Sequence, residues 1–253
     1  MTTIVMVHGA FCGGWAFDRF RAPFEAAGHQ VITPDLRGHT PGARSASVIG
    51  VSMADYAADI AAICAELPEP PVLLGHSMGG LVAQLAAKRA PIEALVLLAP
   101  SPPWGVAGSS IEEAVTAFGV QMMGSFSSGA LDPDRSLMRL YSLDRMLEAE
   151  REAIIAKLGR ESGLAVRETL NWWLDPFMTT SVGAGAITAP SLVISGERDV
   201  VHSSTTARAT AQRIGGAFKV MPGMSHWLVG EPGWDAVADL ALGWLSEAAR
   251  AAA

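Results

Sequence analysis

Charged residues are scarce in this chain, and the basic ones do not gather into clusters. Only 17% of the 253 residues are charged, and the formal net charge is −7. Nucleic acids and anionic membrane surfaces are bound through clustered Lys and Arg. The composition therefore argues against both as partners, and its charge balance is ordinary for a soluble enzyme.

Patterns that bind metals or enter membranes are also lacking. The two cysteines, Cys12 and Cys64, have no metal-ligand spacing, and neither C-x-x-C nor H-E-x-x-H occurs. We therefore expect no metal and no cofactor. No apolar run reaches the roughly 20 residues that span a bilayer, so membrane insertion is not expected. The start, Met1 to Val7, lacks a basic leader and is typical of a strand, which favours a cytoplasmic location.

Short apolar runs alternate with helical patterns, which is typical of a parallel sheet covered on both faces. A chain of this length can form one large α/β domain. A helix is predicted after Ser52, a suitable N-cap with Asp55 three residues on. The six predicted strands are Ile4 to Val7, Val31 to Thr33, Val72 to Leu74, Ala94 to Leu98, Leu192 to Ile194 and Ala217 to Met221.

The alternation stops between Ala99 and Ala189, where helical patterns continue without a convincing strand. We interpret residues 101–188 as a helical cap inserted into a core of residues 1–100 and 189–253. Its segments are predicted to begin near Ser110, Asp132, Ser142 and Ser162. The cap is rich in methionine and aromatic residues, which suit an apolar pocket. The predicted substrate-binding residues are Trp104, Met122, Phe126 and Trp172 from the cap, with Phe11 and Trp227 from the core.

A G-x-S-x-G pattern joins the third predicted strand to a helical pattern, in the run Gly75-His76-Ser77-Met78-Gly79. A serine on such a sharp turn is forced toward positive φ, and the flanking glycines let strand and helix approach each other. Its hydroxyl is then exposed as a nucleophile, and the Met78 amide faces a developing oxyanion. The alternative is a glycine-rich turn with an incidental serine, but the strand and helix on either side argue against it.

A nucleophilic serine needs a base and an acid that orients the base. His226 follows the last predicted strand and is the best placed of the six histidines; His202 is its competitor, while His39 has no evident partner acid in the sequence. For the acid we favour Asp199 over Glu197, both of which follow the preceding strand. The order serine, acid, histidine is that of the nucleophile-elbow fold.

The second oxyanion donor is expected in the glycine-rich loop after the first strand, His8-Gly9-Ala10-Phe11-Cys12-Gly13-Gly14. Glycines there allow a backbone amide to approach the substrate carbonyl. We favour the amide of Ala10, with Phe11 as the alternative.

Together these motifs resemble the α/β-hydrolase fold, in particular small esterases related to plant methyl-ester esterases and hydroxynitrile lyases. The matching residues cover the chain except the cap, and also include Pro34 to His39. The resemblance implies a six-stranded, mainly parallel sheet with helices on both faces and an inserted helical cap. It also supports Ser77, Asp199 and His226 as a triad with Ala10 and Met78 as oxyanion donors. Hydroxynitrile lyases of the group use a cap lysine as well, and here only Lys157 is available, in a charged helical stretch.

The leading hypothesis is hydrolysis of a small to medium, partly apolar carboxylic ester by a monomer or homodimer. Carbon–carbon-bond hydrolases, lactonases and perhydrolases of the same fold share these residues, so they remain alternatives. A small-molecule receptor with an intact triad is a rival from another class, because such a receptor turns its ligand over about once. A degenerate structural member is disfavoured by the complete set Ser77, Asp199 and His226.

Overall fold

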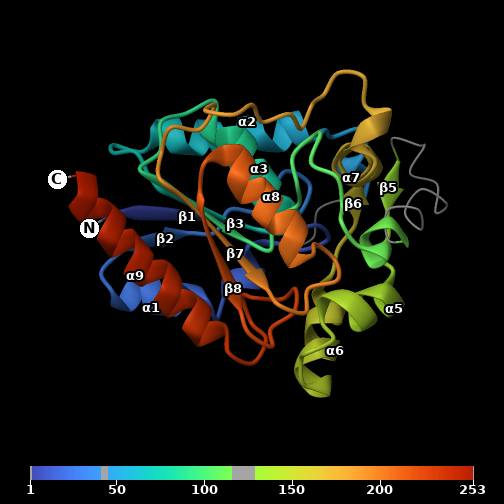
Figure 1. Ribbon diagram of the computed structural model, residues 1–253. Coiled ribbons are helices and arrows are strands. Elements are labelled where there is room, and N and C mark those ends of the chain that lie inside the picture. The colour runs from blue at the N-terminus through green and yellow to red at the C-terminus, as the bar shows by residue number, and fades with distance from the viewer. Residues whose placement is uncertain (1, 41–44, 116–128, 253) are drawn as a thin grey trace.

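The computed structural model describes residues 2–40, 45–115 and 129–252, in which six parallel strands form the central sheet (Figure 1). The strand order is β2-β1-β3-β4-β7-β8, and every neighbouring pair is parallel. The strands are β1 (Thr3–Val7), β2 (Gln30–Ile32), β3 (Val72–His76), β4 (Ala94–Leu98), β7 (Ser191–Gly196) and β8 (Ala217–Met221). All six predicted strands are confirmed, with ends shifted by at most two residues.

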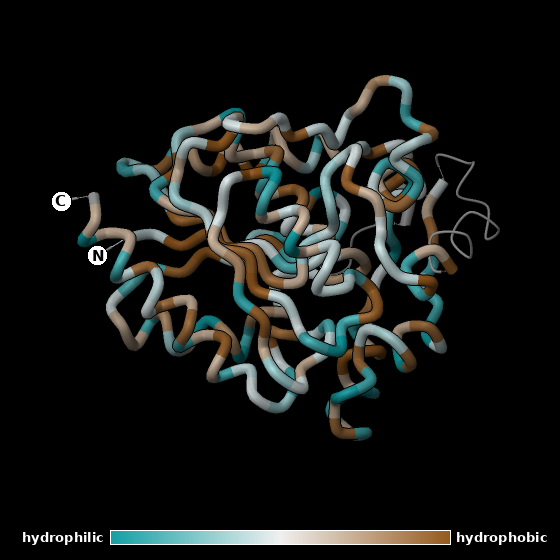
Figure 2. The backbone as a smooth tube through the Cα atoms, in the orientation of Figure 1, coloured by the Kyte–Doolittle hydropathy of each residue, from teal (hydrophilic) through white to brown (hydrophobic). Residues whose placement is uncertain are grey.

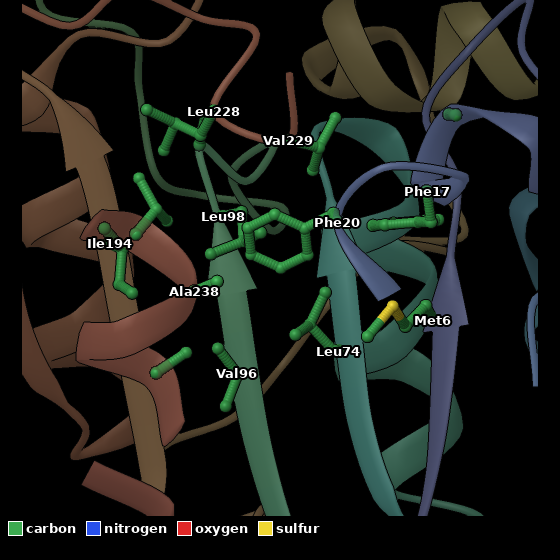
Figure 3. Packing of buried hydrophobic residues seen from close by; sticks show 14 of the residues in the cluster. Met6, Phe17, Phe20, Leu74, Val96, Leu98, Ile194, Leu228, Val229 and Ala238 are labelled. Carbon is green, nitrogen blue, oxygen red and sulfur yellow. The ribbon is translucent and has the colours of Figure 1, made fainter. Parts of the chain in front are cut away.

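Both faces of the sheet are covered by helices, which explains why the four inner strands, β1, β3, β4 and β7, are largely apolar (Figure 2). Successive side chains point to opposite faces. Ile4 and Met6 of β1 therefore join the core beneath α1 (Arg21–Ala26) and α9 (Trp234–Ala252), which Figure 3 shows from close by. Val5 and Val7 join the opposite core, formed with α2 (Met53–Glu66), α3 (Met78–Ala87) and α8 (Ser204–Ile214).

The start of α2 is fixed locally, as predicted. The Ser52 hydroxyl accepts a hydrogen bond from the Asp55 amide at 3.1 Å, and the Asp55 carboxylate accepts from the Ser52 amide at 2.9 Å. This reciprocal capping box satisfies two amides that the first helical turn leaves unpaired.

The segment between β4 and β7 is more than a set of helices. It contains a two-stranded antiparallel sheet of β5 (Ala130–Leu131) and β6 (Glu161–Ser162), which the sequence interpretation missed because two residues show no periodicity. Among its described helices are α5 (Arg135–Leu137), α6 (Glu148–Lys157) and α7 (Gly163–Leu170), with a π-helical turn, Met138–Ser142, after α5.

Some of the helix starts predicted in the cap are confirmed, and one is wrong. Ser162 caps α7, as expected, by accepting from the Ala165 amide. The helix expected near Asp132 begins after Asp134, which is its N-cap. The prediction at Ser142 is wrong, because that serine ends the π-helical turn and α6 begins at Glu148. Within the described residues, no helix is both long and apolar enough to cross a membrane.

Gly79 permits the close approach of α3 to β1, and its replacement tests that contact. A Cβ at position 79 would lie 2.2 Å from the Val7 carbonyl oxygen and 2.3 Å from that of His8. We expect Gly79→Ala to lose more than about 4 kcal/mol of unfolding free energy in urea titrations, because backbone must move.

Gly243→Ala is the matched control for Gly79→Ala. Gly243 lies in α9 and is exposed, and no atom stands within 4 Å of the added Cβ. This variant should gain about 0.5–1 kcal/mol from helix propensity. A Gly79→Ala protein as stable as wild type would contradict the close packing.

Candidate active site

Ser77 lies at the turn from β3 into α3 in the strained conformation predicted for it. Its φ is 54° and its ψ −124°, and its amide donates to the Leu98 carbonyl at 3.0 Å. Gly75 is also required there, because a Cβ at that position would lie 2.4 Å from the Gly79 carbonyl oxygen. The tight turn leaves the Ser77 side chain partly exposed at the carboxyl end of the sheet.

A chain of hydrogen bonds links Ser77 to the two residues favoured as base and acid. His226 Nε2 lies 3.0 Å from Ser77 Oγ, and His226 Nδ1 lies 2.9 Å from Asp199 Oδ2. Asp199 follows β7 and His226 follows β8, so neighbouring strand ends bring them together. This geometry lets the imidazole take a proton from the serine while the carboxylate holds its orientation.

Asp199 is held as an anion within the protein. Burial alone would raise its pKa, but the charge of His226 and its hydrogen bond outweigh burial, so the pKa is lowered. The other oxygen, Oδ1, accepts the amides of Val201 and His202, each at 2.9 Å. Glu197 instead is exposed and accepts the Gly223 amide at 2.8 Å. The structure therefore brings Asp199, and not Glu197, to the histidine.

Two further histidines, His76 and His202, lie beside His226, but neither is placed to act as the base for Ser77. The ring of His202 lies 5.6 Å from that of His226, and His202 Nε2 lies 2.8 Å from Ser101 Oγ. His76 Nε2 donates to the His226 carbonyl at 2.9 Å. Burial lowers the pKa of His202 to about 4 and that of His76 to about 3. Both are therefore neutral near pH 7 and add no positive charge beside His226.

The loop after β1 lies beside Ser77 because β1 and β3 pair, with Val7 opposite Gly75. Ala10 and Met78 line the same cavity as Ser77, which suits their predicted role as oxyanion donors. The alternative donor, Phe11, has its amide engaged elsewhere, at 3.2 Å from Glu161 Oε2. Ala10 is therefore the better placed of the two.

The cavity over Ser77 is lined mainly by apolar side chains and encloses about 1120 Å³, part of it open to solvent. Phe11 and Trp227, both predicted to contact substrate, are among its walls. The cap contributes a second group of lining residues, namely Leu131, Leu137, Met138, Tyr141, Val166 and Leu170. None of these six was among the cap residues predicted to bind substrate.

The two cap tryptophans predicted to bind substrate lie outside this cavity. Trp104 packs its ring edge-on against Trp172, with centroids 5.2 Å apart, and its amide donates to Thr180. Trp172 lines a neighbouring hollow with Trp173. Neither ring is among the residues that line the cavity over Ser77, and composition alone does not distinguish packing within the cap from contact with a ligand. Met122 and Phe126 lie outside the described residues.

Lys157 does not meet the requirement for a lyase-type cap lysine. Its ammonium lies 5.2 Å from the centroid of the Trp15 ring, and it is not among the residues that line the cavity.

No group of three or more His, Cys, Asp or Glu side chains in the described part of the chain could hold a metal ion.

Two buried carboxylates near the site gave no signal in the sequence. Glu161 pairs with His39 Nε2 at 3.0 Å, so the view that His39 lacks a partner acid is wrong. The two residues lie 122 positions apart, and only the fold brings them together. Glu231 accepts the Ser225 amide at 2.7 Å and so holds the loop that carries His226. Burial raises the pKa of Glu231 to about 7.

The sheet, the serine turn and the hydrogen-bonded histidine and aspartate define an α/β hydrolase. The model of the alpha/beta hydrolase family matches residues 4–240, and the chain belongs to that family. Among solved structures, a methylesterase from Arabidopsis has a TM-score of 0.72 at 18% identity, covering 97% of this chain and 99% of that one. A pyrethroid hydrolase from Sphingobium faniae has a TM-score of 0.71 at 24% identity, covering 97% of each.

Three curated relatives are similar over shorter stretches. A carbendazim hydrolyzing esterase of Nocardioides is 34% identical over 150 residues, 55% of this chain and 60% of that protein. A pyrethroid hydrolase of Sphingobium wenxiniae is 40% identical over 80 residues, 32% of this chain and 28% of that protein. Salicylic acid-binding protein 2 of Nicotiana tabacum is 36% identical over 110 residues, 42% of each. The matches thus span less than two thirds of each relative.

Proposed function

We propose that this protein is a serine esterase that hydrolyses small to medium, partly apolar carboxylic esters through an acyl-enzyme. The observation that carries the proposal is the hydrogen-bonded chain from Ser77 Oγ through His226 to Asp199, which opens into an apolar cavity. The names of the relatives support it, because a carbendazim hydrolyzing esterase and a polyneuridine aldehyde esterase are among them.

In the proposed mechanism, Ser77 Oγ attacks the ester carbonyl while His226 Nε2 takes its proton. The amides of Ala10 and Met78 stabilise the tetrahedral oxyanion, and the buried Asp199 carboxylate stabilises the imidazolium. His226 then protonates the leaving alkoxide, so alcohol departs and the acyl group stays on Ser77. Water attacks the acyl-enzyme with His226 again as base, which releases the acid and restores the serine.

The cavity favours an uncharged acyl group. Its two acidic wall residues are already engaged: Asp132 forms an ion pair with Arg160 at 2.8 Å, and Asp134 caps α5. The remaining walls are largely apolar side chains that offer contact area without hydrogen bonds. Such a cavity binds a ligand mainly by burial of apolar surface.

Turnover of p-nitrophenyl esters of increasing acyl length tests the proposal, with lactones and amides assayed beside them. An esterase releases many equivalents of p-nitrophenol per protein. Release of about one equivalent would instead identify a receptor, and turnover confined to lactones would identify a lactonase. Either outcome would overturn the esterase assignment.

The cavity wall from the cap is expected to set substrate choice. Met138→Ala removes apolar contact area from the wall, so the ratio of kcat/KM for a long ester to that for a short one should change by about tenfold. Leu140→Ala is the control, because Leu140 belongs to the same π-helical turn but is 63% exposed and does not line the cavity. Equal losses for both esters in Met138→Ala would refute the assignment.

A further inference from the structure

Phe11, in the oxyanion loop, has a backbone conformation that bulky side chains rarely adopt. Its φ is 64°, in the left-handed region that favours glycine. A strained residue of this kind persists only when its surroundings hold it there, and such residues gather at functional sites. Ala10, the proposed oxyanion donor, immediately precedes Phe11. The groups that hold the Phe11 backbone in place therefore also help to determine where the Ala10 amide lies.

The cap holds the backbone of Phe11 on both sides. Glu161 Oε2 accepts the Phe11 amide at 3.2 Å, and the Gly159 amide donates to the Phe11 carbonyl at 2.9 Å. On the other side of Ala10, Gly9 is packed against the serine turn, where a Cβ would lie 3.1 Å from Ser77 Cβ. The Ala10 amide is thus fixed between the serine turn and the cap.

The carboxylate that holds Phe11 is itself fixed by a buried set of donors. Glu161 is fully buried; its Oε2 also meets His39 Nε2 at 3.0 Å, while Oε1 accepts the Tyr56 hydroxyl at 2.6 Å and the Ser162 amide at 2.7 Å. Burial alone would raise the pKa of Glu161, but His39 and the other donors lower it overall. Burial would likewise lower the pKa of His39, but Glu161 raises it. Each partner of this buried pair therefore stabilises the charged form of the other.

We propose that Glu161 is a positioning residue that holds the oxyanion loop in its strained conformation and so places the Ala10 amide for the reaction. A buried ion pair is costly to form, and removing one partner leaves an uncompensated group. Glu161 belongs to the cap, and its carboxylate accepts hydrogen bonds from Tyr56 of the core and from Phe11 of the oxyanion loop. It therefore connects three parts of the molecule. The inference rests on the proposed esterase function, in which that loop supplies an oxyanion donor.

Glu161→Gln tests the role with little change in shape. The amide keeps its oxygen toward Tyr56 and Ser162, which are both donors, so its NH₂ group faces the Phe11 amide, also a donor. Phe11 then loses its acceptor and the loop relaxes. We expect kcat to fall about 10- to 100-fold, less than the 100- to 1,000-fold for losing a whole oxyanion donor. KM should stay within about threefold of wild type, because ground-state binding is unchanged.

Glu168→Gln is the matched control. Glu168 in α7 is likewise a buried cap carboxylate that accepts a core amide, that of Met53 at 2.7 Å, but it does not contact the oxyanion loop. In Glu168→Gln the side-chain oxygen can keep the bond from the Met53 amide, so this variant changes a buried cap carboxyl group without disturbing the oxyanion loop. Only Glu161→Gln should lose kcat.

A trifluoromethyl ketone adds to the serine and forms a stable oxyanion, so its inhibition constant measures how well the oxyanion is bound. A purely structural role of Glu161 would leave that constant unchanged. The inhibition constant should rise in Glu161→Gln by about the factor that kcat/KM falls, and stay at the wild-type value in Glu168→Gln. The midpoint of the dependence of kcat/KM on pH should not change, because Ser77, His226 and Asp199 are untouched. If Glu161→Gln does not fold, Glu161→Asp, which withdraws the carboxylate by one methylene, should show the same pattern.

The outcomes separate this inference from the proposed function. A wild-type protein that neither turns over esters nor binds the ketone would reject the esterase itself. A wild-type protein that does both, with a folded Glu161 variant that retains the wild-type kcat and inhibition constant, would reject only the positioning role.

Discussion

Replacing Ser77 by alanine should remove ester turnover almost entirely, with a loss on the order of 10⁶ in kcat. That factor corresponds to about 8 kcal/mol of transition-state stabilisation. The loss is large because the triad acts as a unit: without Ser77 Oγ, His226 Nε2 has no nucleophile 3.0 Å away to deprotonate. Steady-state kinetics with a p-nitrophenyl ester measures it, and circular dichroism checks that the fold is kept.

Ser101→Ala is the control for Ser77→Ala. Ser101 also lines the cavity, and its hydroxyl lies 2.8 Å from His202 Nε2. Burial lowers the pKa of His202 to about 4, so its imidazole is a weak base, and among the hydrogen bonds of the described residues none joins that ring to a carboxylate as His226 is joined to Asp199. Loss of the Ser101 hydroxyl should lower kcat by no more than about tenfold. A fluorophosphonate should label Ser77 in wild type and Ser101→Ala, and label nothing in Ser77→Ala, as read by mass spectrometry of the peptides. Activity above about 1% of wild type in Ser77→Ala would exclude Ser77 as the nucleophile.

The sheet and the serine turn could be predicted because local chemistry determines them. The four inner strands, β1, β3, β4 and β7, are buried on both faces and are largely apolar runs. The pentapeptide around Ser77 contains the glycines that the turn requires. Asp199 and His226 could be proposed because each follows a predicted strand, and the carboxyl ends of parallel strands meet at one edge of a sheet.

The sequence indicated where the series of sheet strands is interrupted, between β4 and β7, but not which contacts the residues of that segment make. Trp104 and Trp172 pack against each other, whereas Leu137 and Val166 line the cavity, and composition does not tell these two uses of an apolar side chain apart. The pairing of Glu161 with His39 was also inaccessible. Glu161 stands in a strand of two residues, and its partners His39, Tyr56 and Phe11 are more than a hundred positions away. Only tertiary structure brings such groups into one cluster.

Asp199→Asn should lower kcat by about 10⁴ while leaving the fold and KM nearly unchanged. Asp199 Oδ2 lies 2.9 Å from His226 Nδ1, and Oδ1 accepts the amides of Val201 and His202. The asparagine oxygen will stay with those two amides, which are donors, so its NH₂ group faces Nδ1. His226 must then carry its proton on Nε2, toward Ser77, where it cannot act as a base.

Glu197→Gln provides the comparison for Asp199→Asn, because Glu197 lies two residues away but is exposed and accepts only the Gly223 amide among the hydrogen bonds of the described residues. Its amide can keep that bond through its oxygen, so kcat should remain within about twofold of wild type. Measured side by side, the two variants separate the acid that orients the histidine from a carboxylate that only closes a surface turn. A larger loss of kcat in Glu197→Gln than in Asp199→Asn would mean that the hydrogen bond between Asp199 and His226 does not serve the reaction.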